Sequence, residues 1–412
     1  MYKTRVNIGS IELDNLRNIK DFRYNLQITR WLLQLLGIWP IKSLFYENIQ
    51  CLLFIIICIF LFMFLLIPSC LQAYFEKDAM VKLQNFKPYH ERVMMIGPII
   101  FFTMNTLNYG IILVKKHDIH ACIIQIAIDW HKIKRIENKR IMLKNAKVAR
   151  FFITLCIYFT FGGGMIYISV LPIVKNIIDS SSKNNLAFPS YFFFFNPQVR
   201  PMYDIVLGLQ ILSTFLMFAV VTSIFSIIIN SIMHASSQCT IITAALKKFG
   251  TSGEEKPIKI IVKHHLRVLK FITKLENTLN YACFIELLGC TFNLIMLGYY
   301  LIIHFQNKNI WGIISITLLL ISHGFNLLIF CFAGEHLTQK CENIGKVAYS
   351  INWYELCNSD KQNITFIMVI SGRSIVLTAG KMTILSIYTF CNVMKAFVTY
   401  LNVLRTHIMN SS

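Results

Sequence analysis

The sequence predicts an all-α membrane protein with seven transmembrane helices. Two observations support this fold class. Hydrophobic residues make up 55% of the 412 residues and charged residues only 15%, whereas a soluble domain averages about 25% charged residues. In addition, seven apolar windows are long enough to cross the hydrocarbon of a bilayer as helices. Little of the chain is left over for a separate soluble domain.

The elements follow one another without an internal repeat or a low-complexity segment. Residues 1–47 mix acidic and basic side chains and lack the apolar core and cleavage site of a signal peptide, so we expect a polar arm before the first span. Glu286 is the one charge inside the fifth span and Lys395 the one charge inside the seventh. The predicted spans are 48–75, 93–114, 151–174, 205 to beyond 229, 279–303, 309–334 and 382–404.

Basic residues predict the direction of the spans. Thirty of the 40 Lys and Arg residues lie in the N-terminal arm and in the loops 115–150, 230–278 and 335–381. Because Lys and Arg collect in cytosolic loops, we expect a cytosolic N-terminus and an extracellular C-terminus. Topology and anionic lipid then explain the net charge of +20, and nucleic acid is not an expected partner.

This direction argues against a G-protein-coupled receptor, whose N-terminus lies outside the cell. Such a receptor usually also carries a disulfide at the loop after its third span, and residues 175–202 contain no cysteine. We interpret the 12 cysteines as reduced, small apolar residues. The cytosolic side carries a second pattern. Apolar residues at a spacing of three to four from Leu266 to Leu275 predict that the fourth and fifth helices project beyond the bilayer and pack together.

Motifs of enzymes and metal sites are missing from the sequence. It has no phosphate-binding glycine loop, nucleophile elbow or HExxH motif, so we do not expect an enzyme. His117 and His120, and the pair His264–His265, lack further ligands at metal-site spacing, and we expect them in solvated cytosolic loops. No metal and no cofactor are expected.

Three features leave alternatives open. Glu286 is either a functional group or a paired structural one, since ionisable residues in lipid are costly. Glycines 162–164 either let helices pack closely or open space for a ligand. The aromatic run 191–195 in the loop Ala187–Pro201 either rests at the membrane interface or covers an outer cavity.

The last span carries an unbroken polar stripe. Residues three and four apart share one face of a helix, and one such face is formed by Tyr388, Asn392, Lys395, Thr399, Asn402 and Thr406. Polar groups are costly in hydrocarbon, so this face must look onto protein or water. It belongs either to an internal helix or to a water-filled conduit shared between copies of the helix.

The C-terminal third resembles insect odorant receptors, which are seven-span ligand-gated ion channels with a cytosolic N-terminus. The resemblance lies in Gly334–Glu335, Tyr349, Trp353–Tyr354, the Thr378-Ala379-Gly380-Lys381 turn, Ser386, Thr389–Phe390, Lys395 and Tyr400, and further upstream in Tyr203 and Gln210. Length, span count and inverted topology agree across the whole chain.

The resemblance implies four segments: a cytosolic arm (1–47), helices 1–6 with a ligand pocket in their outer half (48–334), a cytosolic anchor segment (335–381), and a pore-lining seventh helix with a short extracellular tail (382–412). Helices 4–7 would extend into the anchor. The pocket would lie between helices 2, 3, 4 and 6, with Phe101, Phe102, Asn105, Phe161, Met165, Leu207, Gln210, Ile211 and Leu318. The pore would be lined by Asn392, Lys395, Thr399, Asn402, Val403, Thr406 and His407.

The resemblance also implies partners and a location. The chain would be an odorant-tuning subunit that binds small volatile molecules and opens a non-selective cation channel in a hetero-tetramer with a co-receptor, without a G protein. It would lie in the plasma membrane of olfactory sensory dendrites. The connection 230–278 has no obvious insertion of the kind that marks the co-receptor itself.

Two alternatives remain at this point. A gustatory receptor shares the fold but ends its last span with Thr-Tyr, five residues and Gln-Phe, whereas here Thr399–Tyr400 is followed by Thr406–His407. A transporter often shows inverted repeats and broken helices, and neither is clear in this chain.

Overall fold

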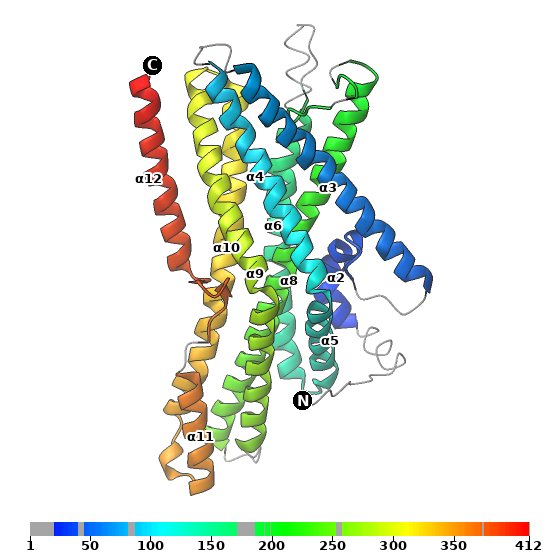
Figure 1. Ribbon diagram of the computed structural model, residues 1–412. Coiled ribbons are helices and arrows are strands. Elements are labelled where there is room, and N and C mark those ends of the chain that lie inside the picture. The colour runs from blue at the N-terminus through cyan, green and yellow to red at the C-terminus, as the bar shows by residue number, and fades with distance from the viewer. Residues whose placement is uncertain are drawn as a thin grey trace.

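The computed structural model describes residues 20–39, 45–80, 87–170, 186–192, 194–197, 199–252, 258–372 and 375–411. Within these ranges the chain is almost entirely helical (Figure 1). Its elements are α2 (Lys20–Leu35), α3 (Phe45–Met80), α4 (Lys87–Val114), α5 (Lys116–Lys132), α6 (Ile136–Met165), the π-helical turn η1 (Ile166–Val170), α8 (Met202–Ser252), α9 (Ile258–Gln306), α10 (Ile310–Ser350), the 3₁₀ turn η2 (Trp353–Glu355), α11 (Asn358–Ser371), β1 (Thr378–Ala379), β2 (Thr383–Ile384) and α12 (Ile387–Ser411).

The all-α fold with seven membrane-spanning helices is confirmed. Seven helices in the described part of the chain are long and apolar enough to cross a membrane. The third predicted span continues as helix to residue 170, and its last four residues lie outside the described residues. The last span begins later than predicted, because residues 382–386 form the end of a hairpin before α12 starts.

Three helices run far beyond their charge-free windows. Helix α8 has 51 residues, α9 has 49 and α10 has 41, whereas about 20 residues cross the hydrocarbon. The extended parts of α8, α9 and α10 and the whole of α11 lie together at the lower end of the bundle (Figure 1). The predicted packing of helices 4 and 5 beyond the apolar region is therefore present, and it buries Ile272 and Leu275 of α9.

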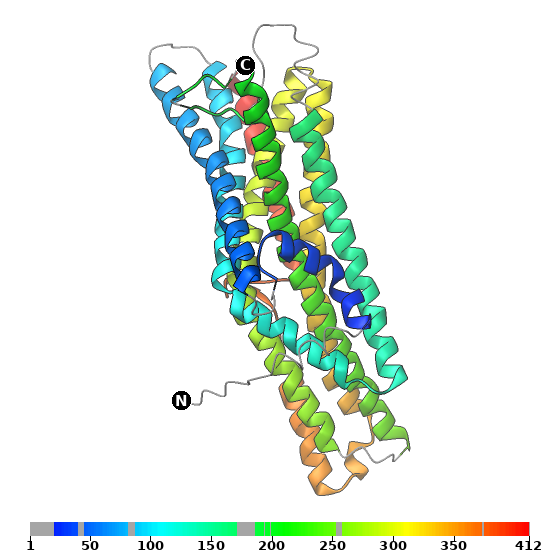
Figure 2. The ribbon, with the colours of Figure 1, turned by 90° about the vertical axis from the view of Figure 1, so that its right-hand side faces the viewer.

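Helix α8 forms the centre of the bundle and α12 its edge. In α8, 83% of the span window is buried, and this helix packs against α6, α9 and α10. Only 11% of the α12 window is buried, and α12 stands beside α9 and α10 with no other described helix on its far side (Figures 1 and 2). In the single chain the central helix α8 is therefore mostly buried, whereas the last helix, α12, stays largely exposed.

The expectation that the histidine pairs lie in loops is wrong. His117 and His120 lie in α5, where the His120 ring nitrogen is 2.7 Å from the Ile38 carbonyl oxygen. His264 and His265 lie in α9, and His265 is only 1% exposed. The loop between the second and third spans folds into α5 because its apolar residues recur on one face and pack against α9. No group of metal-binding side chains occurs among the described residues.

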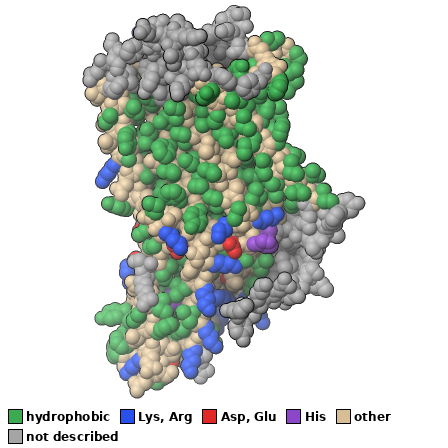
Figure 3. All heavy atoms as spheres, viewed as in Figure 1, with side chains coloured by type: hydrophobic (Ala, Val, Ile, Leu, Met, Phe, Trp, Pro, Cys, Tyr) green, Lys and Arg blue, Asp and Glu red, His purple; other side chains and the backbone are tan. Residues whose placement is uncertain are grey.

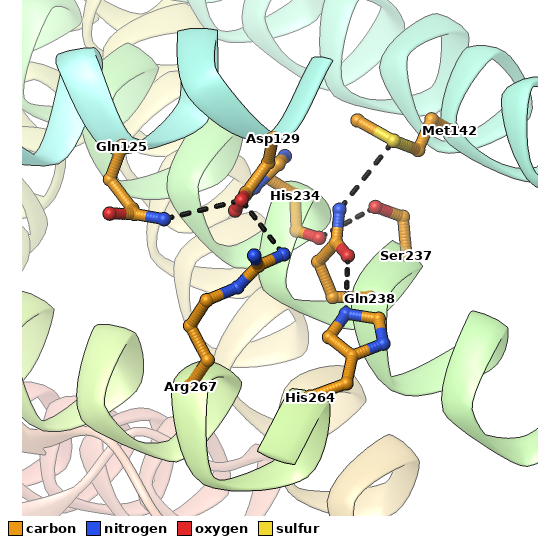
Figure 4. A network of polar contacts seen from close by, with 8 residues as sticks. All are labelled: Gln125, Asp129, Met142, His234, Ser237, Gln238, His264 and Arg267. Carbon is orange, nitrogen blue, oxygen red and sulfur yellow. Dashed lines mark hydrogen bonds and ion pairs between the residues drawn. The ribbon is translucent and has the colours of Figure 1, made fainter. Parts of the chain in front are cut away.

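A buried polar network fixes α5 against α8 and α9 in the lower half of the bundle (Figure 4). The Asp129 carboxylate lies 3.2 Å from His234 Nε2 and 3.0 Å from an Arg267 guanidinium nitrogen. Nearby, the His264 ring is 2.9 Å from the Gln238 amide oxygen. Burial raises the pKa of the Asp129 carboxyl, but the hydrogen bond and charges supplied by His234 and Arg267 outweigh it, so this pKa lies below its ordinary value.

The hairpin between α11 and α12 accounts for the Thr-Ala-Gly-Lys motif. The Met382 N–H donates to the Ala379 carbonyl oxygen at 3.1 Å, and the two central residues of this turn, Gly380 and Lys381, have positive φ, 61° and 59°, as a type I′ turn requires. The Gly380 N–H donates to the Asn280 carbonyl oxygen at 2.9 Å, and a Cβ on Gly380 would lie 2.9 Å from the Phe284 ring. Glycine is thus needed both for the turn and for its close approach to α9.

The start of α12 is capped and held against α10. Ser386 precedes the helix, and its hydroxyl accepts the Thr389 N–H at 3.3 Å, which is the pattern of an N-cap. The Thr389 hydroxyl donates to the Ile384 carbonyl oxygen at 2.6 Å. A Cβ on Gly334 would lie 2.4 Å from the Leu385 carbonyl oxygen, so only glycine allows α10 to approach this backbone.

Candidate ligand-binding site

An apolar chamber lies between the helices in the upper half of the bundle. Its cavity volume is about 80 Å³, and the cavity is partly open rather than sealed. Side chains of α4, α6, η1, α8, α9 and α10 form its walls, together with Phe188 from the connection before α8. The lining residues are Gly97, Pro98, Phe101, Gly164, Tyr167, Ile168, Phe188, Thr214, Phe218, Asn293, Met296, Leu297, Tyr300, Leu319 and His323.

Two glycines shape this chamber. A Cβ on Gly164 would lie 2.2 Å from the Phe218 ring, and a Cβ on Gly97 would lie 2.4 Å from the Tyr300 hydroxyl. The Tyr300 hydroxyl accepts the Gly97 N–H at 3.0 Å and so ties α4 to α9 at the chamber wall. Gly163 faces the backbone of α10 instead. Gly163 and Gly164 therefore both allow close packing between helices, and Gly164 does so at the chamber wall.

A π-helical turn continues the wall formed by α6. The turn η1 begins at Ile166, two residues after the glycine run, and it places Tyr167 and Ile168 against the chamber. Short π-helical segments are uncommon and often occur at functional sites, because they change which side chains face inward.

The connection before α8 supplies part of the chamber wall through Phe188. Gln210 is 1% exposed, its amide nitrogen donates to the Phe188 carbonyl oxygen at 2.9 Å, and its amide oxygen accepts the Phe188 N–H at 3.3 Å. Further along, Phe192 stacks on Phe195 and contacts Phe64 of α3. The bonds to Gln210 thus fix the backbone of Phe188, which lines the cavity, whereas Phe192 and Phe195 pack toward α3.

A polar chamber with a cavity volume of about 40 Å³ adjoins the apolar one. Five residues line both chambers: Phe101, Phe218, Asn293, Leu319 and His323. The polar chamber adds buried polar side chains of four helices: Asn105 and Asn108 of α4, Thr160 of α6, Glu286 of α9, and Ser322 and Asn326 of α10.

The structure brings together only some of the pocket residues predicted from the sequence. Phe101 lines both chambers and Asn105 lines the polar chamber. Three others pack behind the lining: Phe102 against Phe188, Phe161 against Phe218, and Gln210 against the Phe188 backbone. The remaining four, which do not line either chamber, are Met165, Leu207, Ile211 and Leu318.

Helix α9 contributes residues that the sequence analysis did not assign to a pocket. Met296, Leu297 and Tyr300 lie on one face of this helix at a spacing of three to four and line the apolar chamber. Glu286 on the same helix was expected to be either a functional or a paired structural group, but not part of a ligand cavity. Its position within an otherwise uncharged span was the signal that could have extended the predicted site to α9.

The predicted pore residues lie on exposed faces of α12. All six members of the polar stripe, from Tyr388 to Thr406, are exposed in the single chain, and Val403 is 60% exposed. The opposite side of the helix is partly buried through Phe397 and Leu401, which lie against Gly298 of α9. His407 belongs to α12, and its side chain lies outside the described residues.

These features define a multi-pass membrane protein with an apolar cavity between its helices. Residues 89–398 match the family model of the 7tm odorant receptors. The chain therefore belongs to the 7tm odorant receptor family, a family of receptors and not of enzymes.

Individual relatives are distant. The chain is 23% identical to odorant receptor 10 of Aedes albopictus over 215 residues, which cover 50% of this chain and 56% of the relative. It is 24% identical to the odorant receptor coreceptor of Ooceraea biroi over 147 residues, 36% of this chain and 30% of that protein. These matches thus span between about a third and a little over half of the relatives' lengths.

The fold itself is similar over nearly the whole chain. The solved structure of the insect olfactory receptor OR5 from Machilis hrabei in complex with eugenol superimposes with a TM-score of 0.77. This similarity covers 94% of the present chain and 100% of the other at 11% sequence identity. The shared architecture therefore confirms the fold predicted from the sequence.

Proposed function

We propose that this chain is an odorant-tuning subunit that binds small volatile molecules in the apolar chamber and gates a non-selective cation channel together with a coreceptor subunit. The apolar chamber between the helices in the upper half of the bundle is the observation that carries this proposal. Its walls come from five of the spanning helices, so a bound molecule could bias how these helices pack against one another.

The lining supports a small, largely apolar ligand. Aromatic and aliphatic side chains dominate the chamber, as in sites that recognise ligands mainly by shape. One methylene in such a pocket changes binding by only about 1–3 kcal/mol. We therefore expect broad tuning across related chain lengths. The structurally similar receptor from Machilis hrabei holds eugenol, a small aromatic molecule.

We assign the lower end of the bundle in Figure 1 to the cytosol. Below the apolar belt of the upper bundle, Lys and Arg side chains gather on the surface (Figure 3), and basic residues favour the cytosolic side. In this orientation residues 1–47 form a cytosolic arm, residues 335–381 form the anchor, and the C-terminal end of α12 faces outward. The location that fits is the plasma membrane of olfactory dendrites.

The exposed helix α12 supports assembly around a pore. A helix that is mostly uncovered and carries a polar stripe is unfavourable in lipid, but it is well placed if several copies surround a water-filled path. Large aromatic side chains are also exposed in the proposed anchor: Tyr349 is 70% exposed and Tyr354 is 60% exposed. Both surfaces fit contacts between the four subunits of a hetero-tetramer that includes a coreceptor.

The pore assignment predicts changed ion flow in two variants. A ring of side chains sets conduction through its charge, and an apolar constriction gates by dewetting. Lys395→Gln removes a positive charge from the proposed wall and is expected to raise relative calcium permeability. Val403→Ala is expected to raise the current without ligand. Both are measured as reversal potential and basal current in cells that co-express a coreceptor, at matched surface expression.

Lys144→Gln is the matched control, because Lys144 is an exposed lysine of α6 away from α12. It should leave both quantities unchanged. If Lys395→Gln and Val403→Ala also leave reversal potential and basal current unchanged, α12 of this subunit does not face the ions.

A further inference from the structure

The polar chamber contains a buried carboxylate without a basic partner. Glu286 is 7% exposed and lies within the fifth span. One carboxylate oxygen accepts the Asn108 amide N–H at 2.9 Å, and the other lies 3.6 Å from the Cys290 thiol. Among the described residues, no Lys, Arg or His forms an ion pair with it. A buried charge left in this state is strongly unfavourable.

Three amide oxygens of the same chamber also lack partners within the described part of the chain. They are the Oδ1 atoms of Asn105, Asn108 and Asn326, whose residues are 4%, 1% and 5% exposed. Each amide nitrogen already donates to a protein oxygen: to the Phe101 carbonyl, to Glu286 and to the Thr160 hydroxyl, at 2.8, 2.9 and 2.8 Å. Buried polar groups normally find a partner, so these acceptors together point to a missing donor.

The orientation of two of these amides follows from their neighbours. If the Asn105 amide were turned over, its oxygen would face the Phe101 carbonyl oxygen. The same change at Asn108 would place its oxygen against the Glu286 carboxylate. Both contacts would oppose two acceptors. The oxygens of Asn105 and Asn108 therefore remain the unpartnered atoms.

We propose that the polar chamber binds the protonated amine of a small ligand whose apolar body occupies the apolar chamber. An ammonium group offers three donors, no acceptor and one positive charge, which matches one carboxylate surrounded by amide oxygens. This inference rests on the proposed function, since it takes the two chambers as the ligand site. It narrows the ligand class from volatile molecules in general to small aliphatic or aromatic amines.

The junction between the chambers suits such a ligand. Phe101 and Phe218 line both chambers, with their ring centroids 5.8 Å apart in an edge-to-face arrangement. Phe101, Asn105 and Asn108 lie one and two turns apart on a single face of α4. The helix rise places Phe101 and Asn108 about 10 Å apart along the axis, a distance that a ring with a short amine-bearing chain spans. The aromatic rings add a favourable interaction with a cation.

The test compares ligands that share a carbon skeleton but differ in the head group. Phenethylamine and phenethyl alcohol, and hexylamine and hexanol, are applied to cells that co-express the full chain and a coreceptor. The amine of each pair is expected to be the more potent agonist. Glu286→Gln keeps the shape and an acceptor for Asn108 but removes the charge. It should raise the half-maximal concentration of the amines at least about tenfold, since hydrogen bonds to charged groups are stronger than those to neutral groups.

The half-maximal concentrations of the alcohols should change little in Glu286→Gln. Glu137→Gln is the matched control, because Glu137 is 67% exposed at the start of α6 and lines neither chamber, and it should change the response to neither the amines nor the alcohols. Asn105→Val provides a second variant if Glu286→Gln does not reach the surface. It removes one unpartnered acceptor and should weaken the amines more than the alcohols.

The outcomes separate this inference from the proposed function. Equal potency of amine and alcohol, with parallel shifts in the variants, would mean that water alone occupies the polar chamber and would overturn the amine site. Neutral volatiles would still act through the apolar chamber in that case. Absence of a response to every volatile, at normal surface expression with a coreceptor, would overturn both.

Discussion

Asp129→Asn is expected to lower the free energy of unfolding by about 3–5 kcal/mol, the usual cost of removing one member of a buried ion pair. The side chains of Asp129 and His234 are only 6% and 2% exposed, so water screens their interaction weakly. The variant leaves both His234 and Arg267 without their carboxylate. Apparent melting temperatures of the detergent-solubilised protein, compared at one scan rate, measure the effect.

Asp118→Asn on the same helix is the matched control. The Asp118 carboxylate lies 3.6 Å from Lys115, and the Asp118 side chain is 50% exposed. Asp118→Asn should therefore lower the free energy of unfolding by at most about 1 kcal/mol. Equal melting temperatures for the two variants would contradict the role assigned to the buried network.

The same network sets a direction for pH dependence. A carboxyl group whose pKa is lower in the folded than in the unfolded state stabilises the fold above its unfolded pKa. That contribution is lost as the pH falls through the folded value. The free energy of unfolding should therefore differ between the wild-type chain and Asp129→Asn down to about pH 4, the ordinary range of the aspartate pKa. At lower pH this difference should become smaller.

Gly164→Ala is expected to weaken the response to bulky agonists about tenfold. The new Cβ would lie 2.2 Å from the Phe218 ring, so the ring must move. Phe218 is held between Phe101 and Phe161, each with its ring centroid 5.8 Å away, and it has little free space except the chamber. Overpacking of this kind typically costs about 1–3 kcal/mol, and 1.4 kcal/mol corresponds to a tenfold change in affinity.

Gly162→Ala tests the same substitution two residues away. A Cβ there has no atom within 4 Å, so agonist potency should stay within about twofold of wild type, as for surface substitutions. Concentration–response curves at matched surface expression distinguish the two glycines. Similar curves for both variants would show that the Phe218 wall does not limit ligand size.

The number and positions of the transmembrane helices could be predicted from sequence because each helix is determined by its own residues. Each span must present about 20 apolar residues to hydrocarbon, and this requirement is visible in the sequence without any knowledge of the neighbouring helices. The polar stripe of α12 was predictable for the same reason, since one helix determines which of its residues share a face. The hairpin at Gly380 was recognisable as a turn, but its docking on α9 was not.

The cavity lining was harder to predict because it depends on how each helix is rotated in the bundle. Neighbouring residues of a helix point about 100° apart. A small error in the predicted rotation of a helix about its axis therefore assigns the wrong residue to the cavity lining. Leu318 was assigned to the pocket, whereas Leu319 lines it. The contribution of Tyr300 was missed because the fifth helix was not expected to face the cavity.

The most direct test of the central proposal is the current evoked by a volatile agonist in cells that co-express this chain and a coreceptor, with a non-hydrolysable GDP analogue in the pipette. If the apolar chamber gates a channel, current should rise within milliseconds of ligand arrival despite the blocked G proteins. Its agonist ranking should change in Gly164→Ala but not in Gly162→Ala. Loss of the current when G proteins are blocked, or the same agonist ranking from the coreceptor alone, would contradict the proposal.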